Sequence, residues 1–366
     1  MKKFLLFIVV MAMLGVSALS QQIDKPTLTP KPCTDAQHET VQAGVVLHDA
    51  NKYDAAIEKY QQVLTANPDC TLAIYELSMT LYAKGDKTKA METAYRGSKY
   101  KSDQLPLFYL SMANIIDDVG KPDEAVRIYK DGIKMLEGDK TMLPHLSSMH
   151  YNLGITYTGQ KKFKEARDEM KRAIEYNHRY ASPHYVLSKI LFDSRYKIPA
   201  LLAAARFISL EFNSDRSRDA AAIINSVLGS TAARTGANGN ITITLDSGIP
   251  KDEGDFGAAE LILSMTDAIN SKLDDKKTIL TPEENFADRL ESLIGFLDAS
   301  DKKNKETFSA KNYFAFMQEM KKRGFVKPLA YLVLTHTGNQ QALKWIGEND
   351  AKMMEFVTWA KSYEPQ

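Results

Sequence analysis

An alanine recurs through the first half of the chain at the spacing of a helical repeat. Ala56, Ala90, Ala125, Ala166 and Ala200 each stand early in a helix-like segment, and successive members are 34, 35, 41 and 34 residues apart. A fixed period of about 20–50 residues is typical of arrays in which each unit buries its apolar face only against its neighbours. The period therefore predicts a stack of similar units over this half of the chain.

Each unit is predicted to be a pair of antiparallel helices. A small residue stands ahead of each alanine, and a polar or helix-breaking turn lies between the two; these small residues are Gly44, Ser78, Ala113, Gly154 and Ser188. Helix axes can cross closely only where such residues occur, while larger apolar residues fill the space around the crossing. The one longer interval includes the segment 136–146, which contains Gly138 and Pro144. This segment is either a longer loop or a slightly extended helix followed by a loop.

At these positions the sequence resembles the tetratricopeptide repeat family over about residues 37–213. The residues that carry the resemblance are Gly44, Leu47, Ala56, Tyr60 and Pro68; Leu77, Leu81 and Ala90; Met112, Ile116, Ala125 and Tyr129; Leu153, Gly154, Tyr157, Ala166 and Ala173; and Leu187, Leu191 and Ala200. The family's large aromatic residue near the start of the first helix is missing, and Pro199 is compatible only with a first helical turn. The resemblance implies an all-α fold, a solenoid of about five helical hairpins.

The first twenty residues have the pattern of a secretory signal peptide. Lys2 and Lys3 precede an uncharged apolar stretch from Phe4 to Val16, and small residues follow before Gln21. The stretch is shorter than the roughly 20 residues of a membrane span, although a retained N-terminal anchor is the alternative. We therefore expect export, with residues 1–20 removed, and a periplasmic, cell-surface or secreted protein that does not insert into the membrane.

Two cysteines, Cys33 and Cys70, lie one repeat length apart, so both stand on the same edge of the expected array. In an oxidising compartment a disulfide between them is feasible if their Cα atoms come within about 7 Å. The alternative is two unpaired thiols.

The second half is predicted to contain a separate helical domain. Residues 21–36 form an N-terminal extension, and residues 37–228 hold the repeats and a covering helix over 214–227. A linker rich in Gly, Ser and Asn follows over 229–256, with a short strand or extended loop at 240–245. The smaller C-terminal domain over 257–366 is expected to have helices at 257–273, 281–298, 305–323, 328–335, 340–347 and 350–363.

The expected partner-binding surface is the concave face that the resemblance implies, lined by the first helix of each repeat. Helix phase assigns nine residues to partner binding on it: Tyr75, Met79, Tyr82, Asn114, Asp117, Tyr151, Tyr185, Lys189 and Phe192. Aromatic side chains with a polar tip are enriched at recognition surfaces. The alternative for each residue is a role in packing between repeats.

No motif in the sequence indicates catalysis, a metal site or a cofactor. Helical zinc-binding histidines, paired metal-binding cysteines, phosphate-binding loops and nucleophile elbows are all missing. The formal net charge of +1 gives no general attraction to nucleic acid. We expect a non-catalytic scaffold or adaptor of the bacterial cell envelope that binds a protein or peptide. The alternative is a subunit of an envelope complex, or an enzyme, whose functional site lies in the C-terminal helices.

Overall fold

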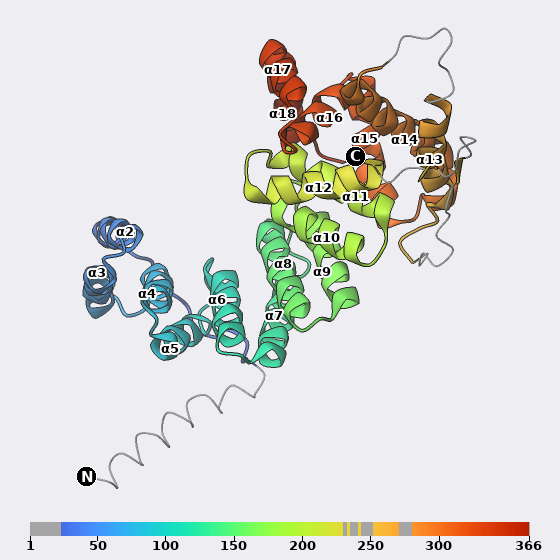
Figure 1. Ribbon diagram of the computed structural model, residues 1–366. Helices are drawn as coiled ribbons and strands as arrows, with labels where there is room; N and C mark the ends of the chain where they lie inside the picture. The colour runs from blue at the N-terminus through green and yellow to red at the C-terminus, as the bar shows by residue number, and fades with distance from the viewer. Residues whose placement is uncertain (1–22, 230–232, 235–240, 243–251, 271–279, 366) are drawn as a thin grey trace, which may run out of the picture. The chain divides into compact units, whose positions relative to one another are not determined.

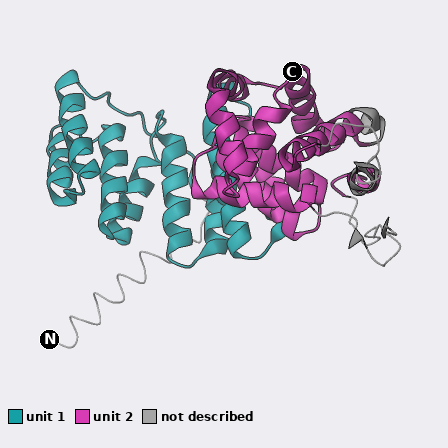
Figure 2. Cartoon of the chain, turned by 45° about the horizontal axis from the view of Figure 1, so that its top comes forward, with its two compact units in different colours: residues 1–166 teal, residues 167–366 magenta. Residues whose placement is uncertain are grey.

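The computed structural model describes residues 23–229, 233–234, 241–242, 252–270 and 280–365. The expected signal peptide over residues 1–20 lies outside them. Contacts along the chain divide it into a first unit, Met1–Ala166, and a second unit, Arg167–Gln366 (Figure 2). The described residues are almost entirely helical, which confirms the predicted all-α fold class.

The first unit is built from helical hairpins in sequence order (Figure 1). Neighbouring helices along the chain pack against each other from α2 to α8. The segment after α7 is a loop with one short 3₁₀ turn, the first of the two alternatives from the sequence. The elements are α2 (Asp35–Asp49), α3 (Tyr53–Ala66), α4 (Thr71–Lys84), α5 (Lys87–Gly97), α6 (Leu105–Asp118), α7 (Pro122–Leu136), η2 (Lys140–Met142) and α8 (Leu143–Gly159).

Local sequence explains where these helices begin and end. Thr34 and Gln37 form a reciprocal capping box at the start of α2. Asp86 caps α5 by accepting a hydrogen bond from the backbone N–H of Lys89. Gly85 ends α4 with a φ of 94°, a left-handed conformation that glycine adopts without steric cost. The turns between the helices therefore follow from the residues that occupy them.

Small residues allow the close helix crossings that the sequence predicted. Ala56, Ala90 and Ala125 are completely buried in the first unit. A Cβ atom added to Gly44 would lie 2.5 Å from Cε1 of Tyr60, and one added to Gly97 would lie 2.2 Å from Cε1 of Phe108. These aromatic rings therefore fill the space that the missing side chains leave.

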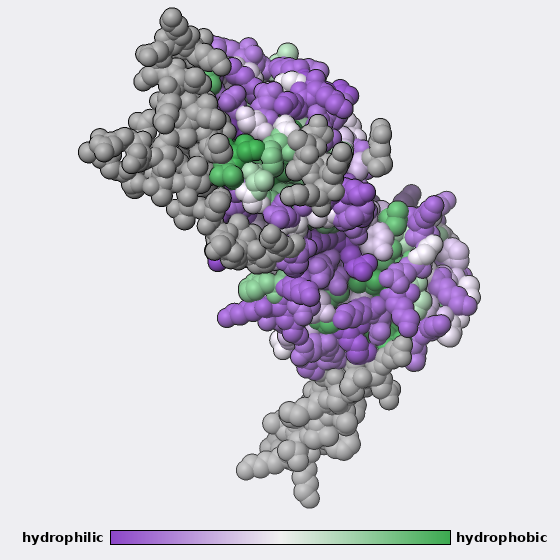
Figure 3. All heavy atoms as spheres, turned by 90° about the vertical axis from the view of Figure 1, so that its right-hand side faces the viewer, coloured by the Kyte–Doolittle hydropathy of each residue, from purple (hydrophilic) through white to green (hydrophobic). Residues whose placement is uncertain are grey.

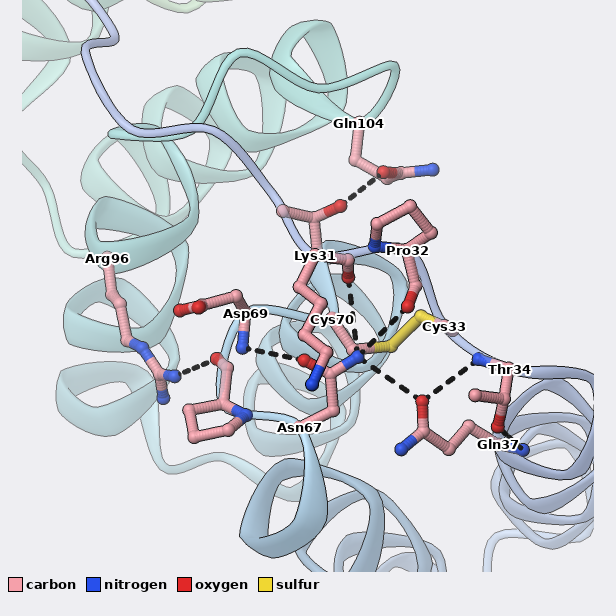
Figure 4. Close-up of a disulfide and its surroundings, with 12 residues drawn as sticks. Lys31, Pro32, Cys33, Thr34, Gln37, Asn67, Asp69, Cys70, Arg96 and Gln104 are labelled. Atoms are coloured by element: carbon pink, nitrogen blue, oxygen red, sulfur yellow. Dashed lines mark hydrogen bonds between the residues drawn. A yellow bond between two sulfur atoms is a disulfide. The ribbon is translucent and has the colours of Figure 1, made fainter.

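A disulfide joins Cys33 to Cys70, with the two Cα atoms 5.3 Å apart. It fixes an N-terminal strap, residues 23–34, along one edge of the hairpins (Figure 4). The Asn67 amide donates to the carbonyls of Lys31 and Pro32 at 3.3 and 3.2 Å. Further back, the backbone N–H of Leu28 donates to the carbonyl of Lys99 at 2.9 Å.

The second unit contains the fifth hairpin and the C-terminal helices. Helix α9 begins just before the boundary between the units. The expected strand at 240–245 is represented by Ile241–Thr242, which pairs antiparallel with Ala233–Arg234. The elements are α9 (Phe163–Tyr176), α10 (Ala181–Asp193), α11 (Lys197–Leu210), α12 (Asp215–Gly229), β1 (Ala233–Arg234), β2 (Ile241–Thr242), α13 (Gly257–Asn270), α14 (Pro282–Asn304), the π-helix η3 (Ala310–Phe314), α15 (Ala315–Lys322), α16 (Val326–Thr335), α17 (Gln340–Glu348) and α18 (Asp350–Ser362).

Helix α11 explains why the fifth hairpin belongs with the C-terminal helices. Every residue from Ile198 to Ser209 is buried, and α11 contacts α10, α12, α16, η3 and α18. A helix that is apolar around its whole circumference must be covered on all sides. The sequence placed the domain boundary at 229–256, whereas the contacts place the division of the chain between Ala166 and Arg167.

Two polar clusters tie separate segments together in this unit. Arg206 is buried and donates to the carbonyls of Ala360 and Tyr363 near the end of α18, at 2.6 and 3.3 Å. Carbonyl groups at a helix C-terminus carry partial negative charge, which compensates a buried cation. The second cluster holds the end of the linker, where the buried Glu253 forms ion pairs with Arg167 and Lys171 of α9.

Candidate partner-binding surface

The first helices of successive hairpins, α2, α4, α6 and α8, contact one another in turn. The second helices α3, α5 and α7 have much less contact among themselves. Stacked hairpins with this asymmetry curve toward the first helices, which then line the inner side. We call this side the first-helix face; it carries the six first-unit residues predicted to bind a partner, on α4, α6 and α8.

On α4 the predicted residues are half-buried, and neighbouring helices hold them in place. The ring of Tyr75 meets the buried ring of Phe108 edge-on, with the centroids 6.0 Å apart. The Ser111 hydroxyl of α6 donates to Sδ of Met79 at 3.3 Å. The hydroxyl of Tyr82 donates to Oδ2 of Asp118 at 3.2 Å.

The polar residues predicted on α6 are engaged with their neighbours. The Asn114 side-chain oxygen accepts from the hydroxyl of Tyr129 and, at 3.2 Å, from the amide of Asn152 on α8. Oδ2 of Asp117 accepts from the Thr156 hydroxyl at 2.7 Å. Both side chains therefore join α6 to α8, which is the packing alternative that the sequence left open. Each is still half-exposed and has hydrogen-bonding capacity left for a ligand.

Tyr151 completes the set in the first unit. It is half-exposed on α8, and Ile155, one turn further on, is 39% exposed. The face therefore ends in an aromatic and an aliphatic side chain.

In the second unit, Tyr185 and Lys189 lie together on α10. The Tyr185 hydroxyl donates to Oδ2 of Asp219 on α12 at 2.7 Å, and Nζ of Lys189 lies 3.4 Å from that hydroxyl. Burial, followed by the hydrogen bond to Asp219, raises the pKa of Tyr185. Phe192 is half-exposed one turn beyond Lys189. The predicted residues thus form two groups, six on the first-helix face and three on α10.

Sequence reasoning missed several charged residues that belong to these surfaces. Asp49 and Glu76 stand on α2 and α4 of the first-helix face, while Asp118 pairs with Lys87. Asp219 was not singled out either, although it accepts the hydrogen bond of Tyr185. Helix phase was used to choose the contacts, and it did not select these carboxylates.

The described residues show neither a metal centre nor a membrane helix. No group of three or more His, Cys, Asp or Glu side chains among them is arranged to hold a metal ion. Within the same residues, no helix combines the length and apolar character needed to cross a bilayer. On the side of the molecule drawn in Figure 3, hydrophilic side chains predominate, with hydrophobic ones in small groups among them.

Several solved structures resemble about half of this chain. Solved structures with a similar fold include PilF of Pseudomonas aeruginosa, with 16% identity and a TM-score of 0.47 over 53% of this chain and 85% of that one. A thermophilic TPR protein of Thermus thermophilus has 17% identity and a TM-score of 0.41 over 51% and 98%. MamA of Desulfovibrio magneticus has 12% identity and a TM-score of 0.39 over 50% and 99%. No curated protein matches the sequence significantly.

Family models described as tetratricopeptide repeat match residues 42–106 and residues 147–178. The first range spans α3 to α5 with part of α2, and the second spans most of α8 and all of α9. Both ranges coincide with helical hairpins that have buried small residues at their crossings, and arrays of such hairpins are in general scaffolds for protein interaction. The chain therefore contains tetratricopeptide repeats in these two ranges.

Proposed function

We propose that this chain is a non-catalytic scaffold or adaptor of the bacterial cell envelope, and that it binds a partner protein or peptide on the first-helix face. The observation that carries the proposal is the row of half-exposed aromatic and polar side chains on consecutive first helices. Tyr75 and Tyr82 lie on α4, Asn114 and Asp117 on α6, and Tyr151 on α8. Tyrosine combines a large apolar area with a polar tip at low entropic cost, which suits recognition of a polypeptide.

The disulfide supports the cellular part of the proposal. Disulfides persist in oxidising compartments and are rare in the reducing cytosol, so the Cys33–Cys70 bond fits an exported protein. N-terminal sequencing of the protein from its host, with thiol labelling before and after reduction, tests this. A protein that starts near Gln21 and whose thiols are labelled only after reduction supports export. One that keeps Met1 and carries two free thiols overturns it.

Site-specific photocrosslinking in the host tests the binding surface. A photoreactive amino acid replaces Tyr75, Tyr82 or Tyr151 in full-length protein, and matched controls replace exposed Gln62 or Glu92 on the second helices. Crosslinks to one protein from the three tyrosine positions and not from the controls support the proposal. Crosslinks from the control positions alone refute it.

A second candidate surface lies on α17 and α18 of the second unit. Leu343 is 47% exposed and Met354 is 58% exposed, and the two large apolar side chains stand on neighbouring helices. This favours the alternative in which the C-terminal helices are the interface of an envelope complex. Crosslinks from Met354, with none from Tyr75, Tyr82 or Tyr151, would move the partner to this surface.

A further inference from the structure

Residues 252–256, at the end of the linker, form neither a helix nor a strand, yet the second unit holds them closely. We call this segment the acidic clasp; its sequence is Asp-Glu-Gly-Asp-Phe. Glu253 is 2% exposed and Phe256 is 6% exposed, whereas the side chain of Asp252 is 51% exposed. Side chains from four other segments of the unit, rather than secondary structure, keep the clasp in place.

Two basic side chains of α9 bind the two carboxylates at the start of the clasp. Nε of Arg167 lies 2.8 Å from Oε1 of Glu253, and Nη2 of Arg167 donates to Oδ2 of Asp252 at 2.6 Å. Lys171 forms a second ion pair with Glu253, and the hydroxyl of Tyr196 donates to Asp252. The arginine side chain is 8% exposed and the lysine side chain 17%. The site therefore presents two largely buried cations to the clasp.

The charge of these two cations determines what the site can hold. Among the described residues, Asp252 and Glu253 are the only carboxylates that pair with Arg167 or Lys171. A buried cation that loses its anion is strongly destabilising, so an empty site is unfavourable. Any occupant of the site must therefore present carboxylates at these two positions.

Asn304 at the end of α14 binds the main chain of the clasp. Its side-chain oxygen accepts from the backbone N–H of Asp255 at 2.9 Å, and its amide donates to the backbone carbonyl of the same residue at 3.2 Å. Asn304 is 2% exposed, so surrounding residues fix the position of this amide. An amide side chain that pairs with both main-chain groups of one residue binds it regardless of its side chain. This contact therefore accepts any residue at the fourth position.

Shape selects the third and fifth positions of the clasp. Gly254 has a φ of 117°, and a Cβ atom there would lie 2.7 Å from Cε2 of Phe256 and 2.9 Å from Oδ1 of Asn304. Glycine alone adopts such a conformation without strain. The ring of Phe256 meets the buried ring of Phe314 in η3 edge-on, with the centroids 6.2 Å apart. Edge-on packing of this kind favours an aromatic side chain at the fifth position.

We propose that these surroundings form a binding site for an acidic polypeptide segment of a partner, and that the clasp occupies the site as an exchangeable ligand from the same chain. The partner segment has two consecutive carboxylates, a glycine, any residue and an aromatic residue. The clasp is bound through its side chains and the main chain of one residue, as a peptide ligand is, so a segment of the same chemistry can replace each contact. The site lies in the second unit and does not depend on the first-helix face.

The clasp competes with the partner segment and so lowers the affinity of the site. The apparent affinity is the intrinsic affinity multiplied by the fraction of molecules in which the clasp is released. Asp252 is the exposed carboxylate of the clasp, so Asp252→Asn weakens the clasp while Glu253 stays paired with Arg167. Loss of this charge-assisted contact should raise the released fraction, and with it the affinity for a partner segment, about tenfold.

Fluorescence anisotropy with the full-length protein tests the proposal. The probe is a labelled peptide with the sequence of residues 251–257, Lys-Asp-Glu-Gly-Asp-Phe-Gly. We expect weak binding by the wild type and about tenfold tighter binding by Asp252→Asn. Glu348→Gln removes an exposed carboxylate on α17 and should bind as the wild type does. Peptides with alanine in place of the first glycine or of the phenylalanine, or with Asn-Gln in place of Asp-Glu, should bind at least about tenfold less tightly.

A photoreactive phenylalanine analogue at the aromatic position of the peptide locates its binding site. Crosslinks should fall on η3, both in Asp252→Asn and in the wild type at high peptide concentration, so the result does not depend on the folding of a variant. Equal affinity of the wild type and Asp252→Asn would overturn the proposal, as would equal binding of the altered peptides or no binding by either protein. Crosslinks to other parts of the chain alone would also refute it.

Discussion

Breaking the Cys33–Cys70 disulfide should destabilise the first unit by about 4 kcal/mol. The bond spans a sequence separation of 37 residues. Closing a loop of that size removes entropy from the unfolded chain worth about 4 kcal/mol at 25 °C. The folded state should change little, because Asn67 and the backbone of Lys99 continue to hold the strap. The effect therefore acts mainly through the unfolded state.

The choice of variant matters because the two cysteines differ in position. Cys33 is half-exposed, so Cys33→Ser leaves no cavity. Cys70 is buried at the N-cap of α4 and makes no side-chain capping bond there. A serine at an N-cap accepts a backbone hydrogen bond worth about 1 kcal/mol. We therefore expect the Cys33→Ser/Cys70→Ser protein to lose about 1 kcal/mol less than Cys33→Ser does.

Urea unfolding followed by circular dichroism and tryptophan fluorescence measures this loss. Both tryptophans, Trp345 and Trp359, lie in the second unit, so their fluorescence reports that unit alone. With an m-value of about 2 kcal/mol/M, the first-unit transition should move down by about 2 M urea. The fluorescence midpoint should stay in place if the units unfold independently. A Cys33→Ser protein with an unmoved circular-dichroism transition would refute the reasoning.

Two further predictions concern packing and pH. Gly97→Ala should destabilise the first unit by about 2 kcal/mol, because the new methyl group overlaps the ring of Phe108. Gly159→Ala, whose Cβ meets nothing within 4 Å, is the control and should leave the urea midpoint nearly unchanged. Burial lowers the pKa of His184 well below 6.5 in the folded state. The unfolded state then binds more protons, so the second unit should lose stability as pH falls below 6.5, by at most about 1.4 kcal/mol per pH unit. Tryptophan-monitored unfolding should show a shallower pH slope for His184→Gln, and a flat wild-type profile between pH 7.5 and 5.5 contradicts the argument.

The repeat half was predictable because close helix crossings constrain the residues that can stand there. Ala56, Ala90, Ala125, Ala166 and Ala200 are all completely buried, as their spacing required. A close helix crossing requires a small residue at a fixed place in each unit, and the residue's size can be read directly from the sequence. A single sequence is therefore enough to locate the crossings.

The extent of the second unit was harder to predict, although one signal was visible. Helix α11 carries only two charged residues, Lys197 and Arg206, whereas α3, α5 and α7 each have a charged side. That contrast already indicates that α11, the second helix of its hairpin, is covered on both sides, whereas one side of α3, α5 and α7 faces solvent. What covers it depends on α16 and α18, more than a hundred residues away, and no local pattern shows that pairing.

The helices that carry the candidate residues could be predicted from the sequence, but the contacts of those residues could not. Helix phase placed Asn114 and Asp117 on the first-helix face, yet it could not show that both bridge to α8. Such bridges join residues about one repeat apart, and they form only at the spacing that the stacked helices adopt.

The Glu76 carboxylate and the disulfide act in opposite directions on one part of the first unit, which leads to a last prediction. Cys70 begins α4, and Glu76 lies on the same helix. The pKa of Glu76 is raised above 4.5 in the folded state, so its ionisation disfavours folding as pH rises through the window above 4.5. At pH 7, Glu76→Gln should therefore stabilise the first unit and partly offset the loss caused by Cys33→Ser.

At pH 4 that advantage should shrink, because the glutamate is then largely protonated in both states. Circular-dichroism unfolding of Cys33→Ser with and without Glu76→Gln, at both pH values, measures the difference. Glu58→Gln, an exposed carboxylate on α3, is the control and should have little effect at either pH. A Glu76→Gln protein less stable than its parent at pH 7 would mean that the carboxylate is already compensated, and it would refute the prediction. A gain at neutral pH alone would show that ionised Glu76 destabilises the part of the first unit that the disulfide stabilises.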